Sequence, residues 1–201
     1  MTAKPEAEVI AILDKPAILE ATERWISSIV IGLNLCPFAN RVHQGNLIRY
    51  VVSDAVDSEA LRSDLADELK LLTSTPIESI ETTVVIHPDV LQRFDDYCDF
   101  LVEAQRLVNA HGYRGVVQIV GFHPAYQFEN AEPEAVENGT NRSPYPMLHL
   151  LREESISKVA GDPAELLEIP KRNAALLRSM GRDKFSKLLA EIVPKERTHA
   201  F

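Results

Sequence analysis

The sequence has few of the features that mark secreted or membrane proteins. It holds two cysteines in 201 residues, and no apolar run approaches the roughly 20 residues that a membrane-spanning helix needs. Its first residues, MTAKPEAEVI, include acids and no apolar core of the kind that a secretory signal has. We therefore expect a cytoplasmic protein that does not bind membranes. Cys36 and Cys98 are expected to be reduced thiols, with a disulfide between them as the alternative.

The usual motifs of several enzyme classes are also missing. There is no GxGxxG, no Walker A loop, no CxxC, no HExxH and no GxSxG. The common nucleotide-binding, zinc-ribbon and serine-hydrolase classes therefore lack their sequence marks. A formal net charge of −9 argues against nucleic acid as a partner.

The charge is unevenly distributed along the chain. Residues 171–201 hold eight Lys and Arg against three Asp and Glu, so this segment carries +5 and the remainder −14. We expect a basic helical tail there. It would dock on its own domain or on a partner, although charge runs more often form a solvated helical face.

Helical and strand patterns alternate along the chain. Helical periodicity is found at residues 17–33, 58–72, 90–111, 145–159, 163–177 and 184–192, and β-formers at 47–53, 82–87 and 115–122. The pattern predicts an α/β fold: an α+β sandwich with a small sheet of three to four strands, βαβ-type crossovers and a helical C-terminal region. A ferredoxin-like variant is the alternative. Because residues 115–122 are nearly all apolar, that strand is expected at the centre of the sheet.

We expect a single domain over residues 1–201, with a flexible start at 1–16. Residues 125–141 form a long acidic loop, which in a compact domain is typical of lids, binding loops or disordered segments. Two strands end in His-Pro, at His87 and His123. If these strands are parallel neighbours, both imidazoles lie at the carboxyl edge of the sheet, where open α/β sheets bind ligands.

The stretch NRSPYPMLHLLREES, residues 141–155, contains several charged or titratable side chains close to two prolines. Ser143 followed by proline is typical of a helix start. On the predicted helix, His149, Arg152 and Glu153 fall at positions i, i+3 and i+4 and share one face. His149 and Glu153 would then ligate a metal, or the carboxylate would orient the imidazole for proton transfer. Arg142 flanks the start and would bind an anion; an ordinary exposed His–Glu or Arg–Glu pair is the alternative.

Cys36 precedes the short helical turn PFANRVH. At its N-cap, the positive end of the helix dipole would lower the pKa of the thiol, with help from Arg41 nearby. The thiol would then be a nucleophile, a redox group or a soft metal ligand; a small buried hydrophobe is the alternative.

The segments LNLCPFA, GFHPAYQF and NRSPYPMLHLLRE together resemble a family of bacterial proteins catalogued only as a domain of unknown function. The resemblance spans about residues 25–156. It implies no activity, but it implies a compact cytosolic protein. It picks out six residues that the motifs also indicate: Cys36, His123, Arg142, His149, Arg152 and Glu153.

These residues lead to a functional hypothesis, an enzyme that acts on a small anionic molecule. The expected catalytic residues are Cys36, His123, His149 and Glu153, and the expected substrate-binding residues are Arg41, Tyr126, Arg142 and Arg152. In one variant, His123, His149 and Glu153 hold iron or zinc. The alternatives are a non-catalytic module that binds a ligand or partner, and a buried polar network that only stabilises the fold.

Overall fold

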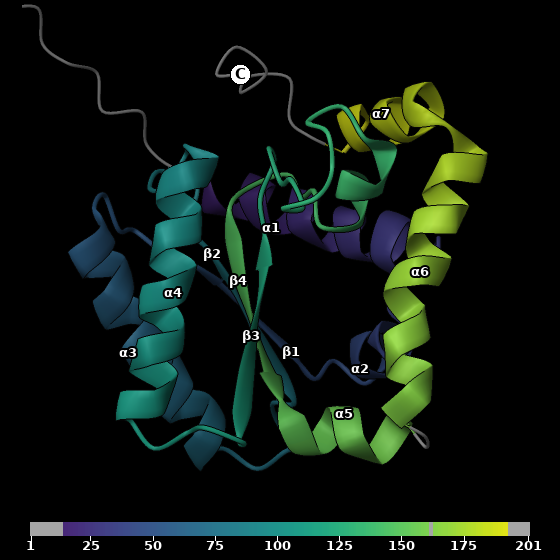
Figure 1. Cartoon of the computed structure of the whole chain (residues 1–201). Helices are drawn as coiled ribbons and strands as arrows, with labels where there is room; N and C mark the ends of the chain where they lie inside the picture. Colours follow the sequence, from purple (N-terminus) through teal and green to yellow (C-terminus); the bar gives the residue numbers. More distant parts are fainter. Residues whose placement is uncertain (1–13, 161–162, 193–201) are drawn as a thin grey trace, which may run out of the picture.

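The computed structural model describes residues 14–160 and 163–192. Its centre is a four-stranded sheet in the order β1-β2-β4-β3, formed by β1 Ile48–Val52, β2 Thr82–Ile86, β3 Val117–Phe122 and β4 Met147–Arg152. β1 and β2 are parallel, and β4 runs antiparallel to both its neighbours. Helices α3 and α4 cover one face of the sheet, and α1, α6 and α7 lie on the other side (Figure 1). The predicted α+β sandwich with a βαβ-type crossover is confirmed.

The face under α3 (Ser58–Ser74) and α4 (Phe94–Ala110) is tightly packed, and we call it the closed face. α3 begins where the Asp57 carboxylate accepts the backbone N–H of Ala60 at 2.8 Å. Its periodic leucines are fully buried, as their spacing predicts: Leu61, Leu65, Leu69 and Leu72. α4 begins four residues later than predicted, because Leu91 adopts a left-handed backbone with φ of 58°.

The predicted helix over 145–159 is wrong in its first half. Met147–Arg152 is strand β4, and only Glu153–Ala160 is helical, as α5. β4 lies between β2 and β3, so it bonds on both sides, and this tertiary pairing overrides the local helix signals. The Ser143 hydroxyl does not cap a helix but donates to the carbonyl of Tyr145 at 2.6 Å. Because β4 takes the inner position, β3 is an edge strand, and its predicted central place is wrong.

The other face meets a looser set of helices, and we call it the hollow face. It is covered by α1 Lys15–Trp25, the π-helix η1 Ile26–Ile31, α2 Ala39–Gln44, α6 Pro163–Met180 and α7 Arg182–Ala190. Helices predicted at 17–33, 163–177 and 184–192 are therefore present with shifted ends. None of the helices in the described ranges has the length and apolar character of a membrane span.

The acidic loop, residues 125–141, packs against the basic helices α6 and α7. Within it, the 3-10 helix η2 Val136–Thr140 packs against α7, and the Gly139 backbone lies so close that an added Cβ would be 2.5 Å from the Phe185 ring. Arg178 pairs with Glu137 at 2.6 Å, and Arg182 pairs with Glu134 at 2.8 Å. The basic segment thus docks on its own chain. Residues 1–13 of the predicted flexible start and 193–201 of the predicted tail lie outside the described residues.

Candidate functional site

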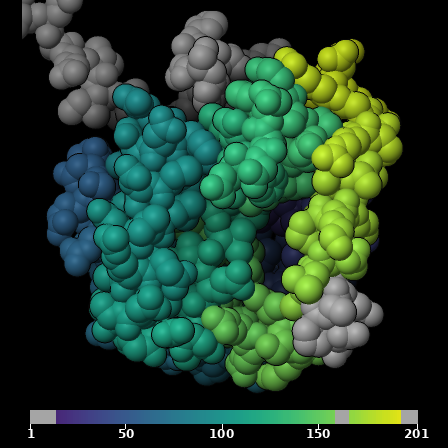
Figure 2. All heavy atoms as spheres, in the orientation of Figure 1, coloured from purple at the N-terminus to yellow at the C-terminus, as the bar shows by residue number. Residues whose placement is uncertain are grey.

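A cavity of about 1140 Å³ lies between the hollow face and α6. Strand residues form its floor, while η1, residues 35–42, α5 and α6 form its walls. Figure 2 shows the surface hollowed between α6 and the neighbouring segments, with purple atoms of the N-terminal segment at depth. The cavity is therefore lined by segments from both ends of the described chain.

The volume of this cavity is comparable to that of known ligand pockets. Ligand pockets commonly measure about 300–1,000 Å³. The cavity opens at the surface, so water fills it when no ligand is bound (Figure 2). Its volume is slightly above this range, which is large enough for a ligand with a sizeable apolar body.

Apolar side chains dominate the lining. Those from the sheet are Ile48, Val84, Val120, Phe122 and Leu151, and those from the walls include Trp25, Ile26, Val30, Leu35, Phe38, Val42, Ile156, Leu166 and Ile169. Burying a Val, Leu, Ile or Phe side chain that faces water is worth roughly 1.5–3 kcal/mol. A ligand that covers several of these side chains would therefore gain much of its binding free energy from apolar contact.

One wall, α6, is fixed in position by two specific hydrogen bonds. α6 is anchored to the turn after η1, where Arg172 donates to the carbonyl of Asn34 at 2.6 Å and Asn173 to that of Leu35 at 2.7 Å. η1 is itself π-helical, a geometry that is frequent at functional sites. The two hydrogen bonds fix α6 to the turn that follows this π-helix.

His149 lies on the floor of the cavity, as one of four predicted site residues that border it. Its Nε2 is 2.7 Å from the hydroxyl of Thr82 on the neighbouring strand. Burial lowers the pKa of His149 to about 4, so the imidazole is neutral at pH 7. A neutral imidazole can accept or donate a hydrogen bond but supplies no charge.

Arg41 also borders the cavity, and its guanidinium forms an ion pair with Glu81. The Glu81 side chain is only 5% exposed, whereas that of Arg41 is 54% exposed. A buried carboxylate needs such a partner, because an unpaired charge is strongly destabilising away from water. The Arg41 guanidinium is therefore already paired with a carboxylate of the protein.

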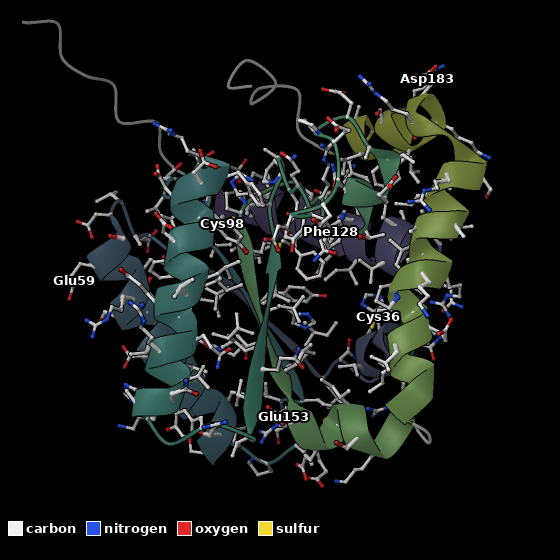
Figure 3. The ribbon with its side chains drawn as sticks, in the orientation of Figure 1. Cys36, Glu59, Cys98, Phe128, Glu153 and Asp183 are labelled. Carbon is white, nitrogen blue, oxygen red and sulfur yellow. The ribbon has the colours of Figure 1, made fainter. Side chains whose placement is uncertain are left out.

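Cys36 borders the cavity beside α6, on the opposite side of the sheet from Cys98 (Figure 3). α2 begins at Ala39 with Phe38 as its N-cap, so the predicted N-cap position of Cys36 is wrong. Burial raises the pKa of the Cys36 thiol, outweighing backbone hydrogen bonds from Phe38 and Ala39 and the charge of Arg172. The predicted lowering of this pKa is wrong as well, since desolvation is larger than the helix-terminus effect.

Arg152 borders the cavity only with part of its side chain. Strand alternation sets it apart from His149, and its guanidinium donates to carbonyls of Thr75 at 2.6 Å and Ile80 at 3.1 Å, and to Leu72. These carbonyls lie at and beyond the end of α3. Arg152 therefore holds the closed face together, which matches the structural alternative rather than substrate binding.

His87 and His123 do come together at the carboxyl edge of β2 and β3, but β4 separates their strands. Both rings flank Tyr97, with centroid separations of 5.8 and 5.0 Å. His87 Nδ1 donates to the carbonyl of Val90 and His123 Nε2 to that of Leu91, each at 3.1 Å. The two imidazoles thus hold the turn that delays the start of α4, and His123 lies away from the cavity.

Arg142 and Tyr126 organise the acidic loop. The Arg142 guanidinium donates to the carbonyls of Tyr126 at 3.3 Å and Pro133 at 2.7 Å. The Tyr126 ring packs against Phe94 and Phe128, with centroid separations of 5.2 and 5.1 Å. Neither residue borders the large cavity, so the predicted substrate contacts are not brought to it.

The predicted metal ligands His123, His149 and Glu153 are not gathered at one point. Glu153 follows the last residue of β4, so about 13 Å of extended chain separate it from His149, at about 3.3 Å per residue. His123 follows Phe122, which pairs with Met147 at the opposite end of β4. In the described ranges, no group of three His, Cys, Asp or Glu side chains is placed to hold a metal ion. Figure 3 shows Glu153 at the start of α5.

Several cavity residues were missed from the sequence. Thr82 and Glu81 lie at the start of β2, and Trp25 at the end of α1 donates from Nε1 to the carbonyl of Arg142 at 3.0 Å. The single tryptophan was a usable signal, because large aromatic side chains often form binding surfaces. The role of Thr82 depends on a partner 67 residues away, which no local pattern reveals.

Searches among curated proteins and among solved structures gave no match to this chain. A family model does match, over residues 17–187, and its description is "Protein of unknown function (DUF1415)". The match includes all three segments on which the resemblance rests. The chain belongs to this family of proteins of unknown function.

Proposed function

We propose that the protein binds a small molecule with a large apolar body in the cavity between the hollow face and α6. The observation that carries this proposal is the cavity itself, about 1140 Å³ lined mainly by apolar side chains. A concave and mainly apolar space of this size is typical of ligand-binding sites.

The charges around the cavity give little support to the small anionic substrate that the sequence suggests. Arg41 is paired with Glu81, Arg178 with Glu137, and Lys171 with Glu168 at 2.7 Å. An anion would have to displace a protein carboxylate from one of these pairs, or draw Arg152 away from the backbone carbonyls that it holds on the closed face. The proposed ligand is therefore mainly apolar, with a polar group that makes hydrogen bonds rather than an ion pair.

An enzyme that acts on the same ligand is the second candidate. It is favoured by one observation: a thiol, Cys36, and an imidazole, His149, border a single cavity. A raised thiol pKa lowers the fraction of nucleophilic thiolate, so binding is the better supported function.

The test is titration with prodan, a neutral naphthalene fluorophore whose emission shifts to the blue in apolar surroundings. Two neighbouring alanines of α6 provide a matched pair of variants: Ala174 borders the cavity, whereas Ala175 is exposed. We expect saturable binding of one prodan per chain. Ala174→Phe should weaken it at least tenfold by filling the space, and Ala175→Phe should leave it unchanged.

An absence of saturable binding would contradict the proposal. So would equal affinity in the wild type and Ala174→Phe, because the probe would then sit elsewhere. Equal loss in both variants would point to a change in α6 rather than in the cavity. Circular dichroism and urea unfolding of each variant check that the fold is retained.

A further inference from the structure

The inference rests on the proposed ligand site and concerns the polar group of its ligand. Thr82 has one hydroxyl hydrogen, and its Oγ1 lies 2.6 Å from the carbonyl oxygen of Leu150 and 2.7 Å from His149 Nε2. A carbonyl oxygen only accepts hydrogen bonds, so the Thr82 hydrogen goes to Leu150. The second contact then requires that His149 Nε2 carry a hydrogen and donate it to Thr82.

This assignment determines the other nitrogen of the ring. In a neutral imidazole with hydrogen on Nε2, Nδ1 has a free lone pair. Within the described part of the chain, Nδ1 of His149 has no hydrogen-bond partner. His149 is partly exposed, its Nδ1 is not one of the fully buried side-chain atoms that lack a partner, and the space that the residue borders is the cavity. A ligand in the cavity would therefore meet an acceptor.

The surroundings of His149 keep its imidazole neutral, with the lone pair of Nδ1 free. Val84 and Val120 are its cross-strand partners, and the Phe122 ring lies 6.2 Å away. Apolar neighbours disfavour the charged imidazolium form of the ring. With Nε2 bonded to Thr82, Nδ1 could donate to an anion only in that charged form. The carboxylate of Glu81, which also borders the cavity, is a second acceptor and is held by Arg41.

We propose that Nδ1 of His149 selects ligands whose apolar body carries a hydrogen-bond donor, such as a phenol, an alcohol or an amide N–H. The residue determines specificity, while affinity comes mainly from the apolar walls. A ligand that offers only acceptors or a negative charge at this position faces the lone pair and binds less well.

The experiment compares two probes of nearly equal shape, 2-naphthol and 2-methoxynaphthalene, which differ in one donor hydrogen. Each displaces prodan, which has no N–H or O–H, from the wild type, His149→Phe and Gln118→Leu. Gln118 is a control because it is a polar cavity residue on β3. We expect a two- to tenfold preference of the wild type for 2-naphthol, about the value of one hydrogen bond. The preference should vanish in His149→Phe and persist in Gln118→Leu.

The outcomes separate this inference from the proposed function. Equal affinity for both probes in the wild type overturns the role of His149 and leaves the cavity as a binding site. Loss of the preference in Gln118→Leu but not in His149→Phe assigns the acceptor to Gln118 instead. If neither probe displaces prodan, the inference is overturned, and if prodan itself does not bind, the proposed function fails as well.

A measurement on the unsubstituted protein tests the same point without relying on a variant that must fold. Nitrogen-15 spectra of histidine-labelled protein distinguish a ring nitrogen that bears hydrogen from one that does not. We expect hydrogen on Nε2 of His149 and none on Nδ1, with a shift of the Nδ1 signal when 2-naphthol binds. Hydrogen on Nδ1, or an Nδ1 signal that 2-naphthol leaves unchanged, overturns the inference.

Discussion

The two faces of the sheet use the same strand for different purposes. On the closed face, Leu148 and Leu150 of β4 pack under α3 and α4. On the hollow face, His149 and Leu151 of the same strand form the floor of a cavity. Successive residues of a strand point to opposite faces, so one short segment serves both a packed core and a binding site.

The difference also shows in how each face treats its polar groups. On the closed side, Arg152, His87 and His123 donate to backbone carbonyls and hold turns in place. On the hollow side, His149 keeps one ring nitrogen without a partner among the described residues. His87 Nε2 also has no hydrogen-bond partner among the described residues, but it is buried in the core, whereas the ring of His149 borders the cavity, where a ligand can reach it.

The largest effect is expected from breaking the closed face at Arg152. Arg152→Met leaves the carbonyls of Leu72, Thr75 and Ile80 without this donor, each costing about 1–3 kcal/mol when buried. We expect a loss of at least about 3 kcal/mol in the free energy of unfolding, measured with urea. Arg106→Met, on the exposed side of α4, is the control and should change stability by less than about 0.5 kcal/mol. A loss below about 1 kcal/mol for Arg152→Met would show that these bonds are not needed.

The second-largest effect is expected from acid, which should lower the free energy of unfolding through His87 on the closed face. His87 is fully buried, and burial lowers its pKa from 6.5 to about 4. Below pH 6.5 the unfolded chain binds a proton that the folded chain takes up only near pH 4, so stability falls as pH falls through this window. The expected loss from His87 is about 3 kcal/mol between pH 7 and pH 4.

Urea unfolding at a series of pH values measures this loss. His87→Gln should be less stable at pH 7 but should show a shallower fall toward pH 4. The fall should not disappear, because burial also lowers the pKa values of His123 and His149. An unchanged pH dependence in His87→Gln would contradict the assignment.

Replacing an alanine by phenylalanine should change the free energy of unfolding differently on the two faces. Ala104 of α4 is 1% exposed within the closed core, whereas Ala174 of α6 borders the cavity. Ala104→Phe should cost about 1–3 kcal/mol or more by overpacking. Ala174→Phe should leave stability unchanged or raise it slightly, since it fills space that is available. Equal losses in urea unfolding would mean that the hollow face is as tightly packed as the closed one.

The smallest effect is expected in thiol chemistry. Burial raises the pKa of both Cys36 and Cys98, so both should be alkylated more slowly than a free cysteine at pH 7. Prodan should slow the alkylation of Cys36 in Cys98→Ser by a few-fold, because both occupy the cavity. It should not affect Cys98 in Cys36→Ser. Protection of Cys98 alone would place the probe on the α4 side of the sheet.

The local patterns predicted much of the fold. The four leucines of α3 lie where their spacing predicts, and the first two strands agree with the predicted ranges to within a residue at each end. The candidate site was predicted less well. Cys36, Arg41, His149 and Arg152 border the cavity, whereas His123, Tyr126, Arg142 and Glu153 do not. Of the latter, His123, Tyr126 and Arg142 form contacts that hold loops, and Glu153 begins α5.

The helix and strand periodicities are contained in the sequence, because they depend on neighbours within a turn or two of the chain. The order of these elements gives the α+β class, and the family model matches residues 17–187. The conformation of residues 147–152 is not determined by such near neighbours. These residues follow a helix-start signal, yet they become a strand because β2 and β3 offer hydrogen bonds on both sides. That insertion moves β3 to the edge and separates His149 from Glu153. It also brings His149 to Thr82, so the chemistry of the cavity is decided by contacts between segments far apart in the chain.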